Sequence, residues 1–338
     1  MPRPIGWSCC GGGSTGRVTL RPDLSLVSVL SGIEMACWDI VGKELDRPEH
    51  ALLGGRVRDR LRTYTYLYPE PADAAEGGAV DAVYSDPELA ARRAVEEVER
   101  GFTAVKFDPA GPYTVFDGRQ PSLEALERSE AFVRLIREAV GTRADLLFGT
   151  HGQFTASGAI RLARRLEAYD PLWFEEPTPP ENPAEMARVA AHTTIPIATG
   201  ERLATKHEFA RVLEAGAASI LQPATGRCGG VLEGKKIAAI AETHGALIAP
   251  HLYCGPIEAA ANIALSACIP NFLILEAIRD FGGFFAELLV QPIVWVDGYV
   301  VPSEAPGLGH DLDEEVARAH PYDGTDLHLT MKETPEPR

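Results

Sequence analysis

The chain has 338 residues, of which 45% are hydrophobic and 24% are charged, a balance typical of a globular protein with a sizeable core. Its formal net charge of −16 argues against a nucleic-acid partner, because phosphate binding requires clustered lysine and arginine. The six cysteines form no C-x-x-C pair, so we expect them to be reduced. We find no uninterrupted apolar run of membrane-spanning length and no signal-peptide pattern, and we therefore expect a cytoplasmic protein without a membrane partner.

The first part of the chain, residues 1–62, is predicted to be a partial N-terminal capping segment. Met1–Arg21 has no hydrophobic periodicity, and we interpret it as a truncated or misread start that replaces part of this domain. A flexible leader is the alternative. A helical pattern follows within Leu26–Leu53 and is closed by Gly54 and Gly55.

The central part, residues 63–285, alternates short apolar runs with longer amphipathic segments. The predicted strands are Thr63–Leu67, Thr103–Phe107, Asp145–Gly149, Leu172–Glu175, Ile195–Gly200, Ser219–Gln222, Leu247–His251 and Phe272–Glu276. The predicted helices are Pro87–Glu99, Leu123–Val140, Ala156–Glu167, Ala184–Ala191, Thr205–Ala215, Val231–His244 and Glu258–Ala267. This alternation predicts a parallel sheet covered by helices, and eight units predict a TIM-type (β/α) barrel. An open doubly wound sheet is the alternative, although no glycine fingerprint follows the first strand.

The last part, residues 286–338, is predicted to return as strands to the capping domain and to end in a polar tail. Asp297 and Gly298 separate two apolar runs, Ile293–Val296 and Tyr299–Val301, which predicts a hairpin. The proline-rich stretch Thr334–Arg338 is expected to be disordered. The predicted fold class is therefore α/β, a TIM-type barrel with an α+β cap formed by the two ends of the chain.

Polar side chains follow almost every predicted strand, at the edge where a parallel barrel has its active site. Charged groups inside apolar strands are costly unless they are paired or serve a site, so this placement predicts a functional site. The residues concerned are Lys106, Asp108, His151, Glu175, Glu201, Gln222, His251 and Glu276.

Two motifs resemble a known family. Trp173–Pro177 (WFEEP) and Ala198–Arg202 (ATGER), whose Glu175 and Glu201 are 26 residues apart, are similar to the mandelate racemase/muconate lactonizing enzyme branch of the enolase superfamily. Further agreement comes from Ser31–Asp39 with Leu53–Gly55, Gly229-Gly230, Ala249–His251 and Pro306–Gly309. The resemblance covers residues 22–330, and within the branch it is galactonate-dehydratase-like.

The resemblance implies a Mg²⁺ ion held by carboxylates at the ends of the third, fourth and fifth strands. Glu175 and Glu201 match the second and third ligands, whereas Gly149 stands at the first position. Mg²⁺ can be held by one or two carboxylates together with waters and substrate oxygens. We expect Asp108, on the neighbouring strand end, to supply the missing carboxylate. The alternative is that Asp108 pairs with Lys106 or caps a loop.

The resemblance also implies an acid–base pair. His251 matches the general base and His151 the general acid, roles suited to a side chain whose usual pKa lies near neutrality. Glu276 matches the residue that hydrogen-bonds the substrate carboxylate, with an ion pair to Arg279 as the alternative. Lys106, the first lysine of the family's K-x-K motif, is the substrate-binding candidate.

The implied activity is dehydration of a sugar acid to a 2-keto-3-deoxy acid, with a homo-oligomer implied as the assembly. An epimerase or cycloisomerase could use the same residues. A decayed enzyme that only binds sugar acids is a further alternative, because Gly149 and Ala224 stand where the family has a metal ligand and the aspartate that supports the histidine matched by His251. The third alternative is a metal-free barrel that catalyses an unrelated reaction.

Overall fold

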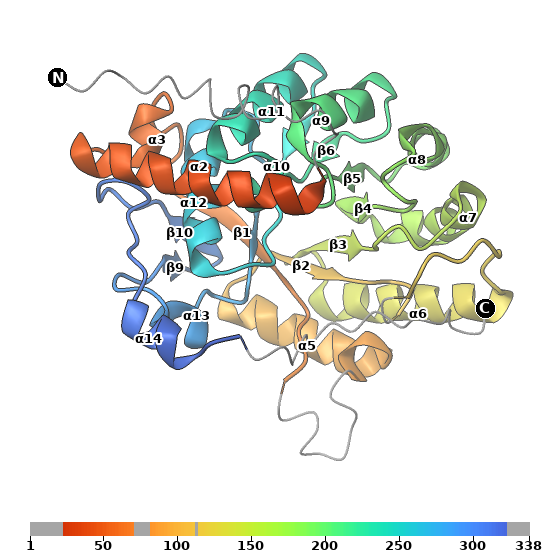
Figure 1. Cartoon of the computed structure of the whole chain (residues 1–338). Helices are drawn as coiled ribbons and strands as arrows, with labels where there is room; N and C mark the ends of the chain where they lie inside the picture. The colour runs from red at the N-terminus through yellow and green to blue at the C-terminus, as the bar shows by residue number, and fades with distance from the viewer. Residues whose placement is uncertain (1–22, 71–81, 112–113, 323–338) are drawn as a thin grey trace.

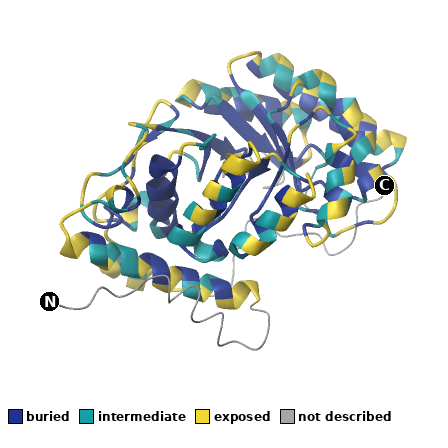
Figure 2. Cartoon of the chain, turned by 90° about the horizontal axis from the view of Figure 1, so that it is seen from above, coloured by how far each residue is buried: buried dark blue, intermediate teal, exposed yellow. Residues whose placement is uncertain are grey.

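The computed structural model describes residues 23–70, 82–111 and 114–322. Within these ranges, eight parallel strands form a barrel that is surrounded by helices (Figures 1 and 2). The strands are β1 (Leu61–Tyr66), β2 (Ala104–Phe107), β3 (Asp145–Gly149), β4 (Trp173–Glu175), β5 (Ile197–Thr199), β6 (Ile220–Leu221), β7 (Leu247–Ile248) and β8 (Leu275–Ala277). All eight overlap predicted strands, and β3 has the predicted bounds.

The barrel is closed, which excludes the open-sheet alternative. β1 pairs with β2 on one side and with β8 on the other, where Thr63 lies opposite Leu275. β7 and β8 meet through a parallel bridge between Ile248 and Phe272, and the Ile248 N–H donates to the Asn271 carbonyl at 2.8 Å. The fold class predicted from the sequence is thereby confirmed.

The helices that cover the barrel pack apolar side chains against it, and α5, α6 and α7 begin with a side-chain cap. They are α5 (Pro87–Arg100), α6 (Leu123–Val140), α7 (Ala156–Leu166), α8 (Pro183–Ala190), α9 (Thr205–Glu214), α10 (Thr225–Cys228), α11 (Val231–Thr243) and α12 (Pro256–Cys268). In α6, the Ser122 hydroxyl accepts from the Ala125 N–H at 3.0 Å, satisfying a free donor of the first turn. Leu126, Phe132 and Ile136 then form the buried face.

The barrel interior begins with an apolar layer. Each strand, or the segment joined to it, contributes one buried residue to this layer. These residues are Tyr64, Ala104, Leu147, Trp173, Ala198, Ile220, Ala249 and Ile274. The rings of Tyr64 and Trp173 meet edge to face with their centroids 5.3 Å apart. Because strand residues two apart share a face, the next inward position on each strand lies directly above this layer.

The N-terminal helix α2 (Leu24–Glu44) is fastened to the barrel by Glu34. Its carboxylate accepts hydrogen bonds from the N–H groups of Val231 and Leu232, at 2.8 and 3.0 Å, and so caps α11. The Trp38 indole N–H donates to the same carboxylate at 2.8 Å. Gly230, with φ +93°, lies where any side chain would collide with Glu34, which explains the Gly-Gly motif before α11.

By length and composition alone, α2 could cross a membrane, with a mean hydropathy of 1.6 over 18 residues. This differs from the expectation that the chain has no such segment. The indication is weak, because core helices of soluble proteins have the same character and Glu34 fastens α2 to α11. The outer face of α2 carries exposed apolar side chains, among them Val29, Ile33 and Ile40.

The C-terminal segment contacts both the barrel and α2. β9 (Val294–Val296) and β10 (Tyr299–Val301) form the predicted hairpin around Asp297 and Gly298, both at positive φ, and β10 pairs antiparallel with β1. The Leu308 N–H donates to the Asp39 carboxylate on α2 at 2.9 Å. The short helices α3 (Glu49–Leu52), α13 (Phe284–Glu287) and α14 (Glu314–Ala319) complete this side.

The interpretations of Met1–Arg21 and Thr334–Arg338 lie outside the described residues. The division of the chain into the segments 1–62, 63–285 and 286–338 stays a prediction.

We expect Glu34→Ala to lower the free energy of unfolding by about 2 kcal/mol, because one buried and two partly buried donors lose their acceptor. Urea unfolding followed by circular dichroism measures this change. Glu44→Ala, at the exposed end of the same helix, is the matched control and should stay within about 0.5 kcal/mol of the wild type. Equal effects of the two substitutions would show that Glu34 does not fasten α2.

Candidate active site

The candidate site is the polar layer that lies one inward position above the apolar layer. Adding two to each apolar position gives Tyr66, Lys106, Gly149, Glu175, Gly200, Gln222, His251 and Glu276. Five of these residues were predicted as site residues from their positions at the strand ends, namely Lys106, Glu175, Gln222, His251 and Glu276. Glu201 follows Gly200 directly, and its carboxylate joins the same group.

Lys106 lies at the centre of this layer. Its ammonium nitrogen is 2.8 Å from Glu175 Oε1 and 3.2 Å from Glu276 Oε1, and the side chain is 2% exposed. It also lies 5.8 and 6.0 Å from the ring centroids of Tyr64 and Tyr66. Burial lowers the pKa of this ammonium, but the two carboxylates outweigh burial and raise it well above its usual range. The two carboxylates therefore favour the charged form of Lys106.

Both carboxylate oxygens of Glu175 already have donors. Lys106 donates to Oε1, while the Gln222 amide, at 2.7 Å, and the Trp173 indole N–H, at 3.2 Å, donate to Oε2. A role for Gln222 and Trp173 was missed by the sequence reasoning. Their positions were the available signal. Trp173 lies two residues before Glu175 and so shares its strand face, and Gln222 is itself one of the polar residues at the strand ends.

A chain of contacts leads from Glu276 around the mouth of the barrel. The His251 Nδ1 atom is 2.8 Å from Glu276 Oε2 and 3.4 Å from Glu201 Oε2. His151 Nε2 is 3.9 Å from the other oxygen of Glu201. The Leu252 N–H donates to Glu276 at 2.8 Å and helps to fix its orientation. Of the eight polar residues predicted at the strand ends, the structure therefore brings together all except Asp108.

Both ring nitrogens of His251 are buried without a well-formed hydrogen bond among the residues that the structure describes, although Nδ1 lies near the carboxylates of Glu276 and Glu201. A buried polar atom without a partner is rare and requires an explanation. The Nδ1 side of the ring is directed at two carboxylates, which leaves Nε2 free to exchange a proton with a bound ligand.

The two histidines differ in proton affinity. Burial lowers the pKa of His251, but Glu201 and Glu276 outweigh burial and raise it above its usual value. His151 is also buried, and there burial prevails over Glu201 and lowers the pKa to about 4. His251 is thus the stronger proton acceptor, and protonated His151 is the stronger proton donor. Glu201, despite its burial, has its pKa lowered to about 2 by the two histidines and Lys106.

Asp108 is not brought to the glutamates. β2 ends at Phe107, so Asp108 lies in the following loop, where its Oδ1 accepts from the Ala110 N–H at 2.7 Å. Its Oδ2 lies 3.4 Å from the Gln153 amide. No group of three or more His, Cys, Asp or Glu side chains suited to a metal is found among the described residues. The metal-ligand prediction for Asp108 therefore finds no support, and its loop-cap alternative describes what is observed.

Two further alternatives are resolved by the ion pairs. Lys106 pairs with Glu175 and Glu276 rather than with Asp108. Arg279 pairs with Glu70 at 2.5 Å, so it does not neutralise Glu276. Both findings leave Lys106 and Glu276 within the site.

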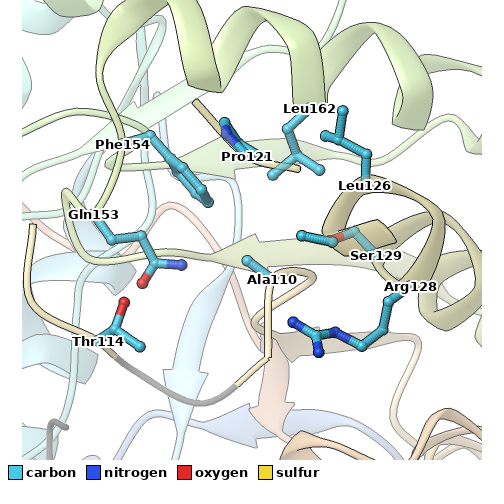
Figure 3. Close-up of a pocket in the computed structure, with 10 residues that line it drawn as sticks. Ala110, Thr114, Pro121, Leu126, Arg128, Ser129, Gln153, Phe154 and Leu162 are labelled. Carbon is cyan, nitrogen blue, oxygen red and sulfur yellow. The ribbon is translucent and has the colours of Figure 1, made fainter. Parts of the chain in front are cut away.

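A cavity beside the barrel is separate from this site (Figure 3). It lies next to the loop that contains Gln153 and has a volume of about 30 Å³, enough for an ordered water. Gln153 Oε1 and Thr114 Oγ1 are buried there without a hydrogen-bond partner among the described residues. We interpret the cavity as a structural water site.

Comparisons with known proteins agree with the fold and identify the family. Residues 89–316 match the family described as Enolase C-terminal domain-like. The D-xylonate dehydratase of Haloferax volcanii is 36% identical over 305 residues, which are 89% of this chain and 71% of that protein. The D-galactonate dehydratase of Ralstonia pickettii is 37% identical over 298 residues, 86% of this chain and 72% of that protein.

Solved structures give the same result. A mandelate racemase/muconate lactonizing enzyme from Sulfitobacter sp. superposes with a TM-score of 0.89 at 53% identity, covering 97% of this chain and 81% of that one. The corresponding enzyme from Jannaschia sp. CCS1 gives 0.87 at 51% identity, covering 95% and 81%. The chain therefore belongs to the enolase superfamily, in its mandelate racemase/muconate lactonizing enzyme branch.

Proposed function

We propose that this chain is a hydro-lyase that dehydrates a sugar acid to a 2-keto-3-deoxy acid. The observation that carries the proposal is the unpartnered Nε2 of His251, buried in one layer with a second histidine and a charged lysine. Relatives that are 33–38% identical are named D-xylonate, D-gluconate/D-galactonate and D-galactonate dehydratases. Aldonic acids are accordingly the substrate class that we propose.

The reaction begins with removal of the weakly acidic proton α to the substrate carboxylate. We assign this step to Nε2 of His251, the stronger proton acceptor. The electron pair left on the α-carbon delocalises into the carboxylate, whose added negative charge is stabilised by the ammonium of Lys106. The bond from the β-carbon to its hydroxyl then breaks, and His151, which its low pKa leaves neutral near pH 7 and which must first take up a proton from solvent, donates that proton so that the hydroxide leaves as water. The resulting enol tautomerises to the 2-keto acid.

Glu276 also has a task in this assignment. It lies 2.8 Å from His251 Nδ1, so from β8 it provides the carboxylate contact to this histidine that the family takes from an aspartate after the sixth strand. Ala224, which replaces that aspartate here, is fully buried and contributes no polar group. The contact from Glu276 therefore weakens the argument that the Ala224 replacement marks a decayed enzyme.

Members of the enolase superfamily generally use Mg²⁺. The described residues of this chain do not fit the three-carboxylate set, because Gly149 offers no ligand and Asp108 lies in a loop. In addition, Lys106, Gln222 and Trp173 already satisfy both oxygens of Glu175. We therefore route no step of the mechanism through a metal.

Aldonic acids incubated with the purified chain should yield 2-keto-3-deoxy acids, detected by semicarbazide absorbance. We expect His251→Asn and His151→Asn each to lower kcat by about 10²–10⁴-fold, the usual contribution of a general acid or base. His207→Asn, on the exposed side of α9, is the matched control and should keep wild-type activity. Turnover that survives in both active-site variants would place the chemistry elsewhere.

The two histidine variants should also differ in deuterium oxide. We expect His251→Asn to lose exchange of the substrate α-proton, because the base is missing. His151→Asn should retain exchange while losing elimination. Proton NMR of the substrate signal measures both. The reverse pattern would exchange the two roles, and exchange without loss of the hydroxyl in the wild type would favour the epimerase alternative.

A further inference from the structure

The space at Gly149 is already occupied by Lys106. A methyl group added to Gly149 would lie 2.6 Å from Lys106 Cε and 3.2 Å from its Cγ, and also 3.2 Å from the Tyr66 ring. Contacts under about 3.0 Å require the neighbour to move. A side chain at position 149 would therefore require the end of the Lys106 side chain to leave its observed position. The glycine is what lets the lysine cross the barrel to reach Glu175.

The charges around this point also favour a resident cation. Glu175, Glu201 and Glu276 are 0%, 6% and 3% exposed, so three carboxylates share one buried layer. Buried carboxylates are stable only with compensating positive charge and hydrogen bonds. Lys106 provides both to two of them. An ammonium has three donors, and the two carboxylates use two, so one remains for a substrate oxygen.

We propose that the ammonium of Lys106 takes the place of the divalent cation and provides the positive charge that stabilises the substrate carboxylate as its charge grows. The site then works without Mg²⁺. This inference rests on the proposed dehydratase function only in one respect, namely that the charge of Lys106 stabilises the carboxylate of a sugar acid. The replacement of the metal by the lysine rests on Gly149, Lys106 and Glu175 alone.

The proposal predicts that the wild-type chain does not bind Mg²⁺ in calorimetric titrations up to about 10 mM, beyond the range of weak protein sites. Turnover of an aldonic acid should be unchanged after treatment with EDTA. Mg²⁺ binding that disappears in Glu175→Gln, or turnover that EDTA abolishes and Mg²⁺ restores, would overturn the proposal.

A designed exchange gives the converse test. Lys106→Ala combined with Gly149→Asp removes the ammonium and adds the carboxylate that the family carries, in the space that the lysine leaves. We expect this double variant to gain Mg²⁺ binding in the micromolar-to-millimolar range, the range of carboxylate sites of moderate affinity. Adding Glu175→Gln should remove the binding again. A folded double variant that binds no Mg²⁺ would contradict the proposal.

These measurements separate the two proposals. Calorimetry requires no turnover, so a chain that dehydrates no sugar acid can still confirm or refute the role of Lys106. If the double variant does not fold, the wild-type titration, with Glu175→Gln as its control, decides the question. Dehydration that depends on Mg²⁺ would support the proposed function and refute this inference.

Discussion

The rest of the site depends on one ammonium group held between two buried carboxylates. Lys106 comes from β2, Glu175 from β4 and Glu276 from β8, so the ion pairs join strands that are not neighbours in the barrel. Removing the ammonium would leave two buried negative charges without compensation, a strongly destabilising change. Glu276 in turn orients His251, and Glu201 lies between His251 and His151. The two histidines that we propose as the acid–base pair are therefore positioned by the lysine through the carboxylates.

Much of this arrangement could be predicted because the relevant signals are local. The two-residue repeat of a strand decides which side chains point inward, and the carboxyl ends of parallel strands share one edge. These rules located Lys106, Glu175, His251 and Glu276 before any contact was known. The eight strands could be predicted for the same reason, since apolar runs alternate with amphipathic helices. The Asp-Gly turn of the C-terminal hairpin is an equally local signal.

The remainder depends on contacts across the barrel, which no local pattern contains. Asp108 has the right spacing from Lys106, but β2 ends at Phe107 and the Asp108 carboxylate accepts from the Ala110 N–H in the following loop. Gly149 could only be interpreted as a missing ligand, because the sequence does not show that Lys106 fills its space. Gln222 was visible at a strand end, yet its hydrogen bond to Glu175 is a feature of the closed barrel.

The central claim is that a lysine stands where the superfamily holds its metal. The most direct test is a crystal structure of the wild-type chain grown with Mn²⁺, whose anomalous scattering identifies the ion in place of Mg²⁺. The claim predicts Lys106 Nζ between Glu175 and Glu276, as in the present structure, with no anomalous peak in the site. A Mn²⁺ ion bound to Glu175 and Glu201, with Lys106 turned away, would contradict it.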